Sequence, residues 1–524
     1  MRTNKKVQNM NDMDIADAIR LGCDTMQNIS NAVPFIGSIV KPESKTAQPF
    51  SAYHSESQLP GRYLNALLNA EDAVGVKLEE DAVENHRRAA FFSYSRQVML
   101  PLNRQEPEGL PVNFCPHNLR EGFHALYALA RYRNDKKACR LAEGSIAAVF
   151  DLWDPDNGWD IKRLDALGLN YQKCQGFIHG EARMLGPLVK YYRATGYGPA
   201  LKLALVLKEK AISEFFLSGG AFNVKRFFTV HSHSITCVMS SLAQLADLLG
   251  DASLAMHVKA FYDNGLWSMR DEIGWSPEMA DQEGSDHGEV NNTGDILETA
   301  LILGRWGYPE CYHDAERILR CHLLPSQLRD LSFISNPPNP DGLRDVSSRH
   351  LGGFGFPAPY GHESIGRGRR GVLSFAMDIV GGTVGSLCEA YREAVRSDST
   401  CHRVNLLFDH ETNALRVQSP YTHDCLRIKP KRSGSLFVRI PHWLNHDKVK
   451  IGGNSVPPIR ASGYLFFSEV SAGQTIELRF PLKEVQLTLS GRLHINPIRV
   501  KIRGDAVMSM DNFGADLTFF DPYE

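Results

Sequence analysis

Apolar residues recur at spacings of three and four along the chain up to about residue 395, the pattern that amphipathic helices produce. The segment 62–68 shows this spacing first, and 123–132 repeats it before a turn at Asn134-Asp135. A turn that bears Gly or Asn then leads into a second apolar helical segment, and the unit recurs about every 55–60 residues. The pattern therefore predicts a series of helical hairpins.

Such hairpins can stack in an open line or close into a ring. About ten to twelve helices of three or four turns each suit an (α/α)₆ toroid with six hairpins, and an open solenoid is the alternative. The loops between the helices are long and rich in Gly and aromatic residues, for example 153–160 and 275–292. Because loops of this kind gather at one mouth of a toroid, whereas solenoid loops are shorter and more alike, we expect the toroid.

The pattern changes near Arg396, beyond which apolar and polar residues alternate. Segments such as Leu436–Ile440 and Ile476–Phe480 have the period of two expected of half-buried strands, and Gly, Pro, Asn and Asp separate them. The final segment therefore predicts an antiparallel β-sandwich after a mainly α body. The expected domains are an N-terminal segment at 1–50 with strands that join the sandwich, a catalytic barrel at 51–395, and the sandwich at 396–524.

Composition and charge narrow the class of protein. The 524 residues include 58 Lys and Arg against 60 Asp and Glu, a formal net charge of −2. This balance speaks against a nucleic-acid-binding protein and against a polybasic protein of the membrane surface. No apolar stretch is long enough for a membrane span, and the polar N-terminus is unlike a signal peptide. We expect a cytoplasmic protein, with a homodimer left open.

Ten cysteines are scattered along the chain, and none forms a Cys-x-x-Cys pair. Their spacing therefore does not indicate a thiolate zinc site. Buried free thiols in a reducing compartment are the interpretation that we favour.

The predicted sandwich carries a recognisable series of motifs. The first reads Leu-Phe-Val-Arg-Ile-Pro-His-Trp at 436–443, and it is followed by the segments 449–454, 463–465 and 473–482. In residue types, order and spacing, this series resembles the C-terminal sandwich of the β-L-arabinofuranosidases of glycoside hydrolase family 127. The helical region is similar more loosely, around 231–234 and 287–291. The resemblance implies an (α/α)₆ barrel with a β-sandwich that acts on glycosides.

The chain departs from this family at the residues that carry its chemistry. The resemblance implies a zinc-bound cysteine as nucleophile, from a Cys-Cys pair at a glycine-rich helix start. The matching start at Met377–Thr383 has no cysteine, and the family's Glu-Thr-Cys phrase reads Glu289-Val290-Asn291 here. Only Glu289 of the implied ligands remains, fewer than the four or so that zinc needs. We therefore expect no metal, no other cofactor, and carboxylate chemistry in place of the thiolate.

The densest group of acidic residues lies between Trp275 and Glu289, before the helix predicted from Ile296 and thus at the mouth of a toroid. Glycosidic cleavage needs one protonated carboxyl group and one carboxylate. Burial and like charges raise the pKa of one member of such a group. Because the resemblance implies that Glu289 lies in the active centre, we expect it to be catalytic, with Asp286 second and Glu283 third; a solvated loop with helix-capping residues is the alternative.

Other side chains have the chemistry of sugar recognition, which needs flat apolar faces and polar edges. Trp159 and Trp275 are candidates for stacking, with core packing as the alternative. The histidines of the His-Ser-His motif at 231–233 are expected to contact sugar or a catalytic carboxylate rather than a metal. The expected substrate-binding residues are His179, Glu181, His231, His233, Trp159, Trp275, His287, Tyr360 and His362.

A long aromatic loop at 354–364 is followed by Arg367, Arg369 and Arg370. We expect this loop to form a lid over the pocket, and an arginine there would suit a uronate carboxylate. A solvated basic turn is the alternative for the arginines.

Three functions are compatible with these expectations. The first is a glycosidase, an O-glycosyl hydrolase of carbohydrate metabolism, that cleaves an oligosaccharide or glycoside by carboxylate acid/base chemistry. The second is a polysaccharide lyase or uronyl-processing enzyme, in which a Tyr or His removes a proton. The third is a catalytically inactive carbohydrate-binding relative. We take the first as the prediction, with a small carbohydrate or glycoside as the partner and no nucleic acid or membrane.

Overall fold

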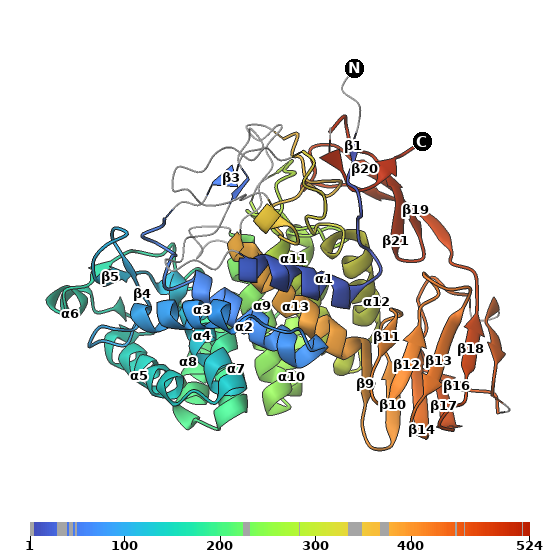
Figure 1. The fold of residues 1–524 in the computed structure, drawn as a ribbon, viewed down its shortest axis with the longest axis horizontal. Coiled ribbons are helices and arrows are strands. Elements are labelled where there is room, and N and C mark those ends of the chain that lie inside the picture. The colour runs from blue at the N-terminus through green and yellow to red at the C-terminus, as the bar shows by residue number, and fades with distance from the viewer. Residues whose placement is uncertain are drawn as a thin grey trace.

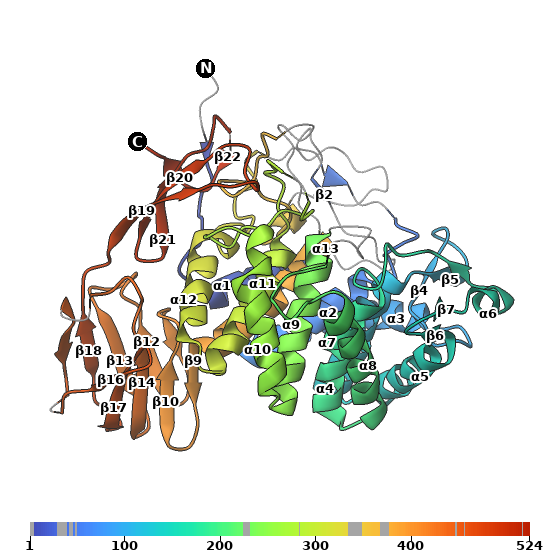
Figure 2. The same ribbon diagram turned by 180° about the vertical axis from the view of Figure 1, so that it is seen from behind.

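A helical body is followed along the chain by a β-rich region, which lies beside it in Figures 1 and 2. The computed structural model describes residues 5–28, 39–40, 46–47, 50–223, 231–281, 283–333, 348–366, 377–445, 448–454, 456–515 and 517–524. Among these residues, no helix combines the length and the apolar character needed to cross a membrane.

Six helices form the centre of the helical body. Each packs against the next, and the last packs against the first, so that they form a closed cycle. Most residues of such helices are buried, because neighbours surround them. The six are α2 (Leu59–Val74), α4 (Leu119–Arg133), α7 (Leu185–Thr195), α9 (Ser232–Leu249), α11 (Val290–Arg305) and α13 (Met377–Ala394).

A second set of helices packs on the outside of this cycle, each against one or two of the inner helices. The turns that join the pairs have the predicted chemistry. Asn134 and Gly250 adopt left-handed conformations at helix ends, with φ of 51° and 64°, and Asp135 and Asp251 cap the helices that follow. The outer helices are α1 (Ile15–Asn28), α3 (Glu80–Ser93), α5 (Lys136–Leu152), α8 (Gly198–Glu214), α10 (Ala252–Asp263) and α12 (Pro309–Ile318).

Short elements fill the loops of the helical body. A small sheet contains β4 (Leu102–Arg104), β5 (Pro111–Phe114) and β8 (Asn170–Tyr171), and β6 (Trp153–Asp154) pairs with β7 (Gly158–Trp159). The remaining elements are the helix α6 (Ile161–Ala166), the 3₁₀ turn η2 (Glu181–Met184) and the strands β2 (Ile39–Val40) and β3 (Thr46–Ala47).

Two five-stranded sheets share one apolar core, to which Leu436 and Val438 of one sheet and Ile428 and Leu478 of the other contribute. The first has the order β16 (Ile459–Ala461), β17 (Tyr464–Val470), β14 (Gly434–Arg439), β10 (Cys401–Val404) and β9 (Val395–Ser397). The second has the order β11 (His410–Glu411), β12 (Leu415–Gln418), β13 (Leu426–Pro430), β18 (Ile476–Arg479) and β15 (Lys450–Gly452).

In these two sheets, the expectation of purely antiparallel pairing is wrong at one place, because β10 and β14 are parallel neighbours. Between them the chain crosses to the other sheet, forms β11 to β13 there, and returns in the direction in which it left. A period of two indicates which residues face the core, but it does not reveal the direction of a neighbouring strand.

A third sheet lies on the helical body. It has the order β19 (Glu484–Leu489), β20 (Ile498–Arg503), β21 (Ala506–Met510) and β23 (Asp521–Pro522). Its apolar face forms a core with Trp275 and Tyr360 from the loops of that body. Near it, β1 (Lys5–Lys6) pairs in parallel with β22 (Leu517–Thr518). The C-terminal strands therefore cover loops of the helical body instead of extending the two-sheet core.

Candidate active site

Inner helices of the cycle begin at the same end of the helical body, and a titratable residue lies at or just before the start of each. These titratable residues recur with the hairpin repeat. An alignment of the hairpins in the sequence could therefore have found them. Only Glu289, His179 and His231 of this set were singled out beforehand. The residues are His54, His117, His179, His231, Glu289 and Asp378, from α2, α4, α7, α9, α11 and α13 respectively.

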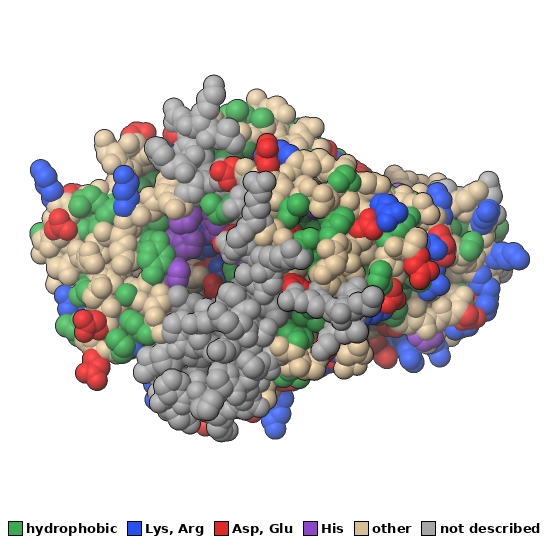
Figure 3. All heavy atoms as spheres, turned by 90° about the horizontal axis from the view of Figure 1, so that it is seen from above, with side chains coloured by type: hydrophobic (Ala, Val, Ile, Leu, Met, Phe, Trp, Pro, Cys, Tyr) green, Lys and Arg blue, Asp and Glu red, His purple; other side chains and the backbone are tan. Residues whose placement is uncertain are grey.

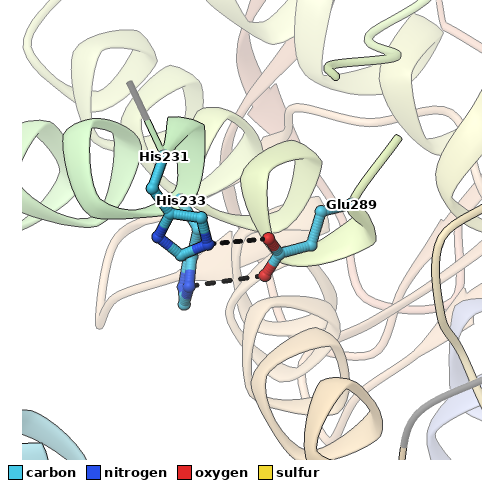
Figure 4. Close-up of side chains that lie close together, drawn as sticks. All are labelled: His231, His233 and Glu289. Carbon is cyan, nitrogen blue, oxygen red and sulfur yellow. Dashed lines mark ion pairs between the residues drawn. The ribbon is translucent and has the colours of Figure 1, made fainter. Parts of the chain in front are cut away.

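Backbone pairing between two loops positions the centre of this site. The Ser232 N–H donates to the carbonyl of Glu278, and the Glu289 N–H donates to that of Ser276, at 2.9 and 3.1 Å. The segment that ends at Glu289 is thereby fixed against the start of α9. As a result, the Glu289 carboxylate faces the side chains at the start of α9 (Figure 4).

Glu289 lies between two imidazoles. His231 Nε2 is 3.3 Å from Glu289 Oε2, and His233 Nδ1 is 3.4 Å from Glu289 Oε1. The Glu289 residue is only 4% exposed and His233 is 2% exposed, whereas the His231 side chain is 19% exposed. The sequence prediction that a histidine of this motif contacts a catalytic carboxylate thus has a geometric basis at Glu289.

Two further imidazoles, those of His117 and His179, adjoin this centre. The ring of His179 is 4.4 Å from that of His117 and 5.5 Å from that of His231, between centroids. Burial lowers the pKa of His179 to about 3 and that of His117 well below its usual value, and the guanidinium of Arg183 adds to both. These rings are therefore neutral at pH 7. Figure 3 shows histidine side chains in a hollow, with charged side chains beneath them.

Asp378 adds a carboxyl group at the start of α13. Burial raises its pKa to about 6, and the charges of Glu289 and Glu121 add to this effect while Arg62 opposes it. Its side chain is 18% exposed. The guanidinium of Arg62 donates to the Asp378 carbonyl at 2.8 Å. Sequence reasoning missed Asp378, although the resemblance had marked this helix start as the place of the family's nucleophile.

A pocket of about 320 Å³ opens beside the histidines and has Trp159, Tyr171, Glu181 and Asp156 in its lining. Trp159 Nε1 donates to Glu181 Oε1 at 2.6 Å. Burial raises the pKa of Glu181 to about 7. The pocket combines aromatic surface with carboxyl groups, as sugar binding requires.

Asp286 does not lie at this centre. Its buried carboxylate accepts hydrogen bonds from Tyr360 Oη, Ser364 Oγ and the N–H groups of Ile365 and Gly366. These bonds occupy both carboxylate oxygens and hold the loop to which Tyr360 belongs. With both oxygens occupied in this way, Asp286 has the geometry of a loop anchor.

We expect the variant Asp286→Ala to lower the free energy of unfolding by about 2–3 kcal/mol, since buried donors would lose their acceptor. Chemical denaturation followed by tryptophan fluorescence measures this. The matched control is Glu283→Ala, at an exposed position of the same loop, for which a change below about 0.5 kcal/mol is expected. Equal stability of the two variants would contradict the anchoring role of Asp286.

Three aromatic or histidine candidates are part of the protein core. Trp275 is fully buried, and its Nε1 donates to the carbonyl of Pro357 at 3.0 Å. Tyr360 and His362 are each 2% exposed, and His362 packs edge-on against Phe519. All three side chains are therefore packed among protein groups, with almost no surface exposed.

The remaining candidates lie apart from the Glu289 carboxylate. The His287 ring stacks on Phe356, and His287 Nε2 is 3.2 Å from Glu278 Oε2. Glu283 is exposed and lies next to the segment that contains Arg492. The described part of the predicted lid is largely buried beneath the third sheet. Arg367, Arg369 and Arg370 lie outside the described residues.

The cysteine-bound zinc that the resemblance implies does not fit this site. Where the family has a cysteine, the Asn291 amide lies 3.3 Å from Glu289 Oε1. A Cβ on Gly382 would come within 2.4 Å of Asn291 Oδ1, so the start of α13 packs directly on this amide. In the described part of the chain, two other groups could hold a cation: His231, His233 and Glu289, and His233, Cys237 and Asp295.

The fold is similar to those of solved carbohydrate-active enzymes. A family 127 β-L-arabinofuranosidase from Geobacillus stearothermophilus T6 is 13% identical, with a TM-score of 0.55 over 95% of this chain and 85% of that one. A second family 127 β-arabinofuranosidase is 14% identical, with a TM-score of 0.60 over 95% and 83%. A sugar epimerase from a ruminal bacterium is 11% identical, with a TM-score of 0.51 over 72% and 99%.

These likenesses confirm, for the fold, the resemblance that the sandwich motifs indicated. No family model and no curated protein matches the chain.

Proposed function

We propose that the protein is a glycoside hydrolase-like enzyme that cleaves a glycosidic bond in an oligosaccharide or glycoside by carboxylate acid/base chemistry. In this proposal the closed cycle of helices is a six-hairpin (α/α)₆ toroid, and the two five-stranded sheets are its sandwich. The reaction takes place where the inner helices begin. The observation that carries the proposal is the placement of two unlike carboxyl groups, Glu289 and Asp378, at that end.

Asp378 has the raised pKa that the proton donor of glycosidic cleavage requires. Asp378, with a pKa of about 6, retains a proton in part of the population near neutral pH and donates it to the leaving oxygen. Glu289 lies beside two imidazoles and supplies the negative charge opposite the acid. In this proposal the pocket lined by Trp159 and Glu181 binds a sugar ring of the substrate. Experiments identify the sugar of the substrate, its anomeric form, and whether cleavage retains or inverts the configuration.

A panel of nitrophenyl glycosides, with arabinofuranosides and glucuronides first, tests the proposal. We expect one glycoside to release nitrophenol at a rate that depends on enzyme concentration, and the same preparation of Glu289→Gln to release almost none. If no member of the panel is cleaved and natural oligosaccharides are also left intact by mass spectrometry, the proposal is wrong.

A second function is favoured by the neutral histidines. A lyase or uronyl-processing enzyme removes a proton from carbon, and a neutral imidazole is a suitable base. His117, His179 and His231 adjoin one another, and Arg183 lies close enough to lower the pKa of His117 and His179. Formation of an unsaturated uronate, seen by its ultraviolet absorbance when a polyuronate is added, would favour this function over hydrolysis.

A further inference from the structure

The ligand atoms of His231, His233 and Glu289 come together from two helix starts, and all lie within 4.8 Å of one another. We propose that these three side chains bind a divalent transition-metal ion of the zinc class. The sequence analysis predicted no metal, because the family's cysteine ligands are missing and the histidines at 231–233 were expected to contact sugar or a catalytic carboxylate instead. The site proposed here has a different ligand set, in which the start of α9 supplies two imidazoles, and it stands whether or not the protein cleaves glycosides.

The spacing between the ligand atoms supports a common ion. The two nitrogen–oxygen distances are 3.3 and 3.4 Å. A charge-assisted hydrogen bond between nitrogen and a carboxylate is shorter, about 2.7–2.9 Å. Two ligands on one tetrahedral zinc, each bonded at about 2.05 Å, are separated by about 3.3–3.4 Å. Each of the two observed distances, one to each oxygen of Glu289, matches the separation of neighbouring ligands on one ion.

The other nitrogen of each imidazole already has a partner. His233 Nε2 lies 3.5 Å from Asp295 Oδ2, and Thr236 Oγ1 donates to the same carboxylate oxygen at 3.0 Å. His231 Nδ1 lies 3.0 Å from Ser234 Oγ. A histidine that binds a metal usually gives its second ring nitrogen to such a group, which fixes the tautomer and the orientation of the ring.

His233 is held at both ring nitrogens. Nδ1 faces the Glu289 carboxyl group at 3.4 Å, and Nε2 faces the Asp295 carboxyl group at 3.5 Å. With an ion bound, Nδ1 gives its lone pair to the metal and Nε2 donates its proton to Asp295.

The donor set selects the kind of ion. Two imidazole nitrogens and one carboxylate suit zinc and its neighbours in the first transition series, whereas magnesium and calcium prefer oxygen ligands. Three protein ligands leave a fourth position for water or substrate. The His231 side chain is 19% exposed, which gives this position access to solvent. The ion changes only how Glu289 would serve the proposed hydrolysis, as a ligand rather than as a free carboxylate.

Metal binding without substrate tests the site. The full chain, freed of metal with a chelator, is titrated with Zn²⁺ in a calorimeter and with Co²⁺ by visible absorption. We expect one ion per chain, the visible bands of a four-coordinate Co²⁺ site, and no comparable binding of Mg²⁺. The variants His231→Ala and Glu289→Gln should each weaken Zn²⁺ binding at least about 100-fold, and Asp295→Asn should weaken it about 10–100-fold.

The matched control is His287→Ala, which removes a buried imidazole outside the set and should leave Zn²⁺ affinity unchanged. His231 is the partly exposed ligand, so His231→Ala is the variant best placed to stay folded, and circular dichroism verifies this. The proposal is overturned if the wild-type chain binds no stoichiometric Zn²⁺, or if folded His231→Ala binds it as well as wild type. Neither outcome depends on cleavage of a glycoside, so the two proposals fail separately.

Discussion

The variant Glu289→Gln is expected to lower kcat/KM for the cleaved glycoside by about a thousandfold, while the protein remains folded. Glutamine keeps the size of the side chain but carries no negative charge, so the group opposite the proton donor is lost. The two neighbouring imidazoles cannot replace it, because they supply no negative charge. Initial rates at several substrate concentrations measure the effect, and circular dichroism monitors the fold.

The control for this prediction is Glu283→Gln, which makes the same chemical change at an exposed position six residues away in the same loop. We expect this variant to retain wild-type kcat/KM within about twofold. If Glu289→Gln is folded and as active as wild type, carboxylate chemistry at Glu289 is excluded. If wild type and variant both bind the sugar and neither cleaves it, the protein is a binding relative and not an enzyme.

The variant Asp378→Asn is expected to slow cleavage in proportion to the basicity of the leaving group. An alkyl glycoside needs proton donation to the departing oxygen, so its kcat/KM should fall by about 10²–10⁴-fold. In a dinitrophenyl glycoside of the same sugar, the leaving group departs without that help. The kcat/KM for this substrate should therefore fall far less. Both substrates are measured on one enzyme preparation, so errors in folding or concentration lower both rates by the same factor. A difference between the two substrates therefore reports the loss of proton donation.

A matched control for Asp378 is Glu389→Gln, because Glu389 lies on the same helix, α13, but near its other end and with a 44% exposed side chain. We expect this control to match the activity of wild type toward the alkyl glycoside and toward the dinitrophenyl glycoside. If Asp378→Asn lowers kcat/KM by the same factor for good and poor leaving groups, Asp378 is not the proton donor. Glu181, the other carboxyl group with a raised pKa beside the histidines, then becomes the residue to replace.

The helical hairpins and the strands were predictable because their signals are local. Apolar spacing, the turn at Asn134-Asp135 and the turn at Gly250 each act through neighbours within a few residues. Glu289 was also singled out before the structure, because the family resemblance implies that it lies in the active centre and because it ends an acidic segment ahead of a helix. Asp378 was not, because a single Asp in the first turn of a helix resembles an ordinary response to the helix dipole.

Charge and aromatic character alone misassigned several residues. Trp275 and Asp286 have the residue types of a sugar site, yet the third sheet and the loop at 360–366 bury them. Burial of this kind depends on strands that follow about 200 residues later in the chain. No local pattern reports it, so residue type could not separate an anchor such as Asp286 from a catalytic group such as the one proposed at Glu289.

By itself, the sequence determined the elements, their order and the residues that begin each inner helix. Whether those beginnings meet was decided by the tertiary structure, through closure of the helical cycle. His231, His233 and Glu289 come from two hairpins more than 50 residues apart, and only packing of α9 against α11 brings their polar atoms within 4.8 Å. Helices and strands form through contacts between residues that are close in the sequence. A site forms only when packing brings together residues that are far apart in the sequence.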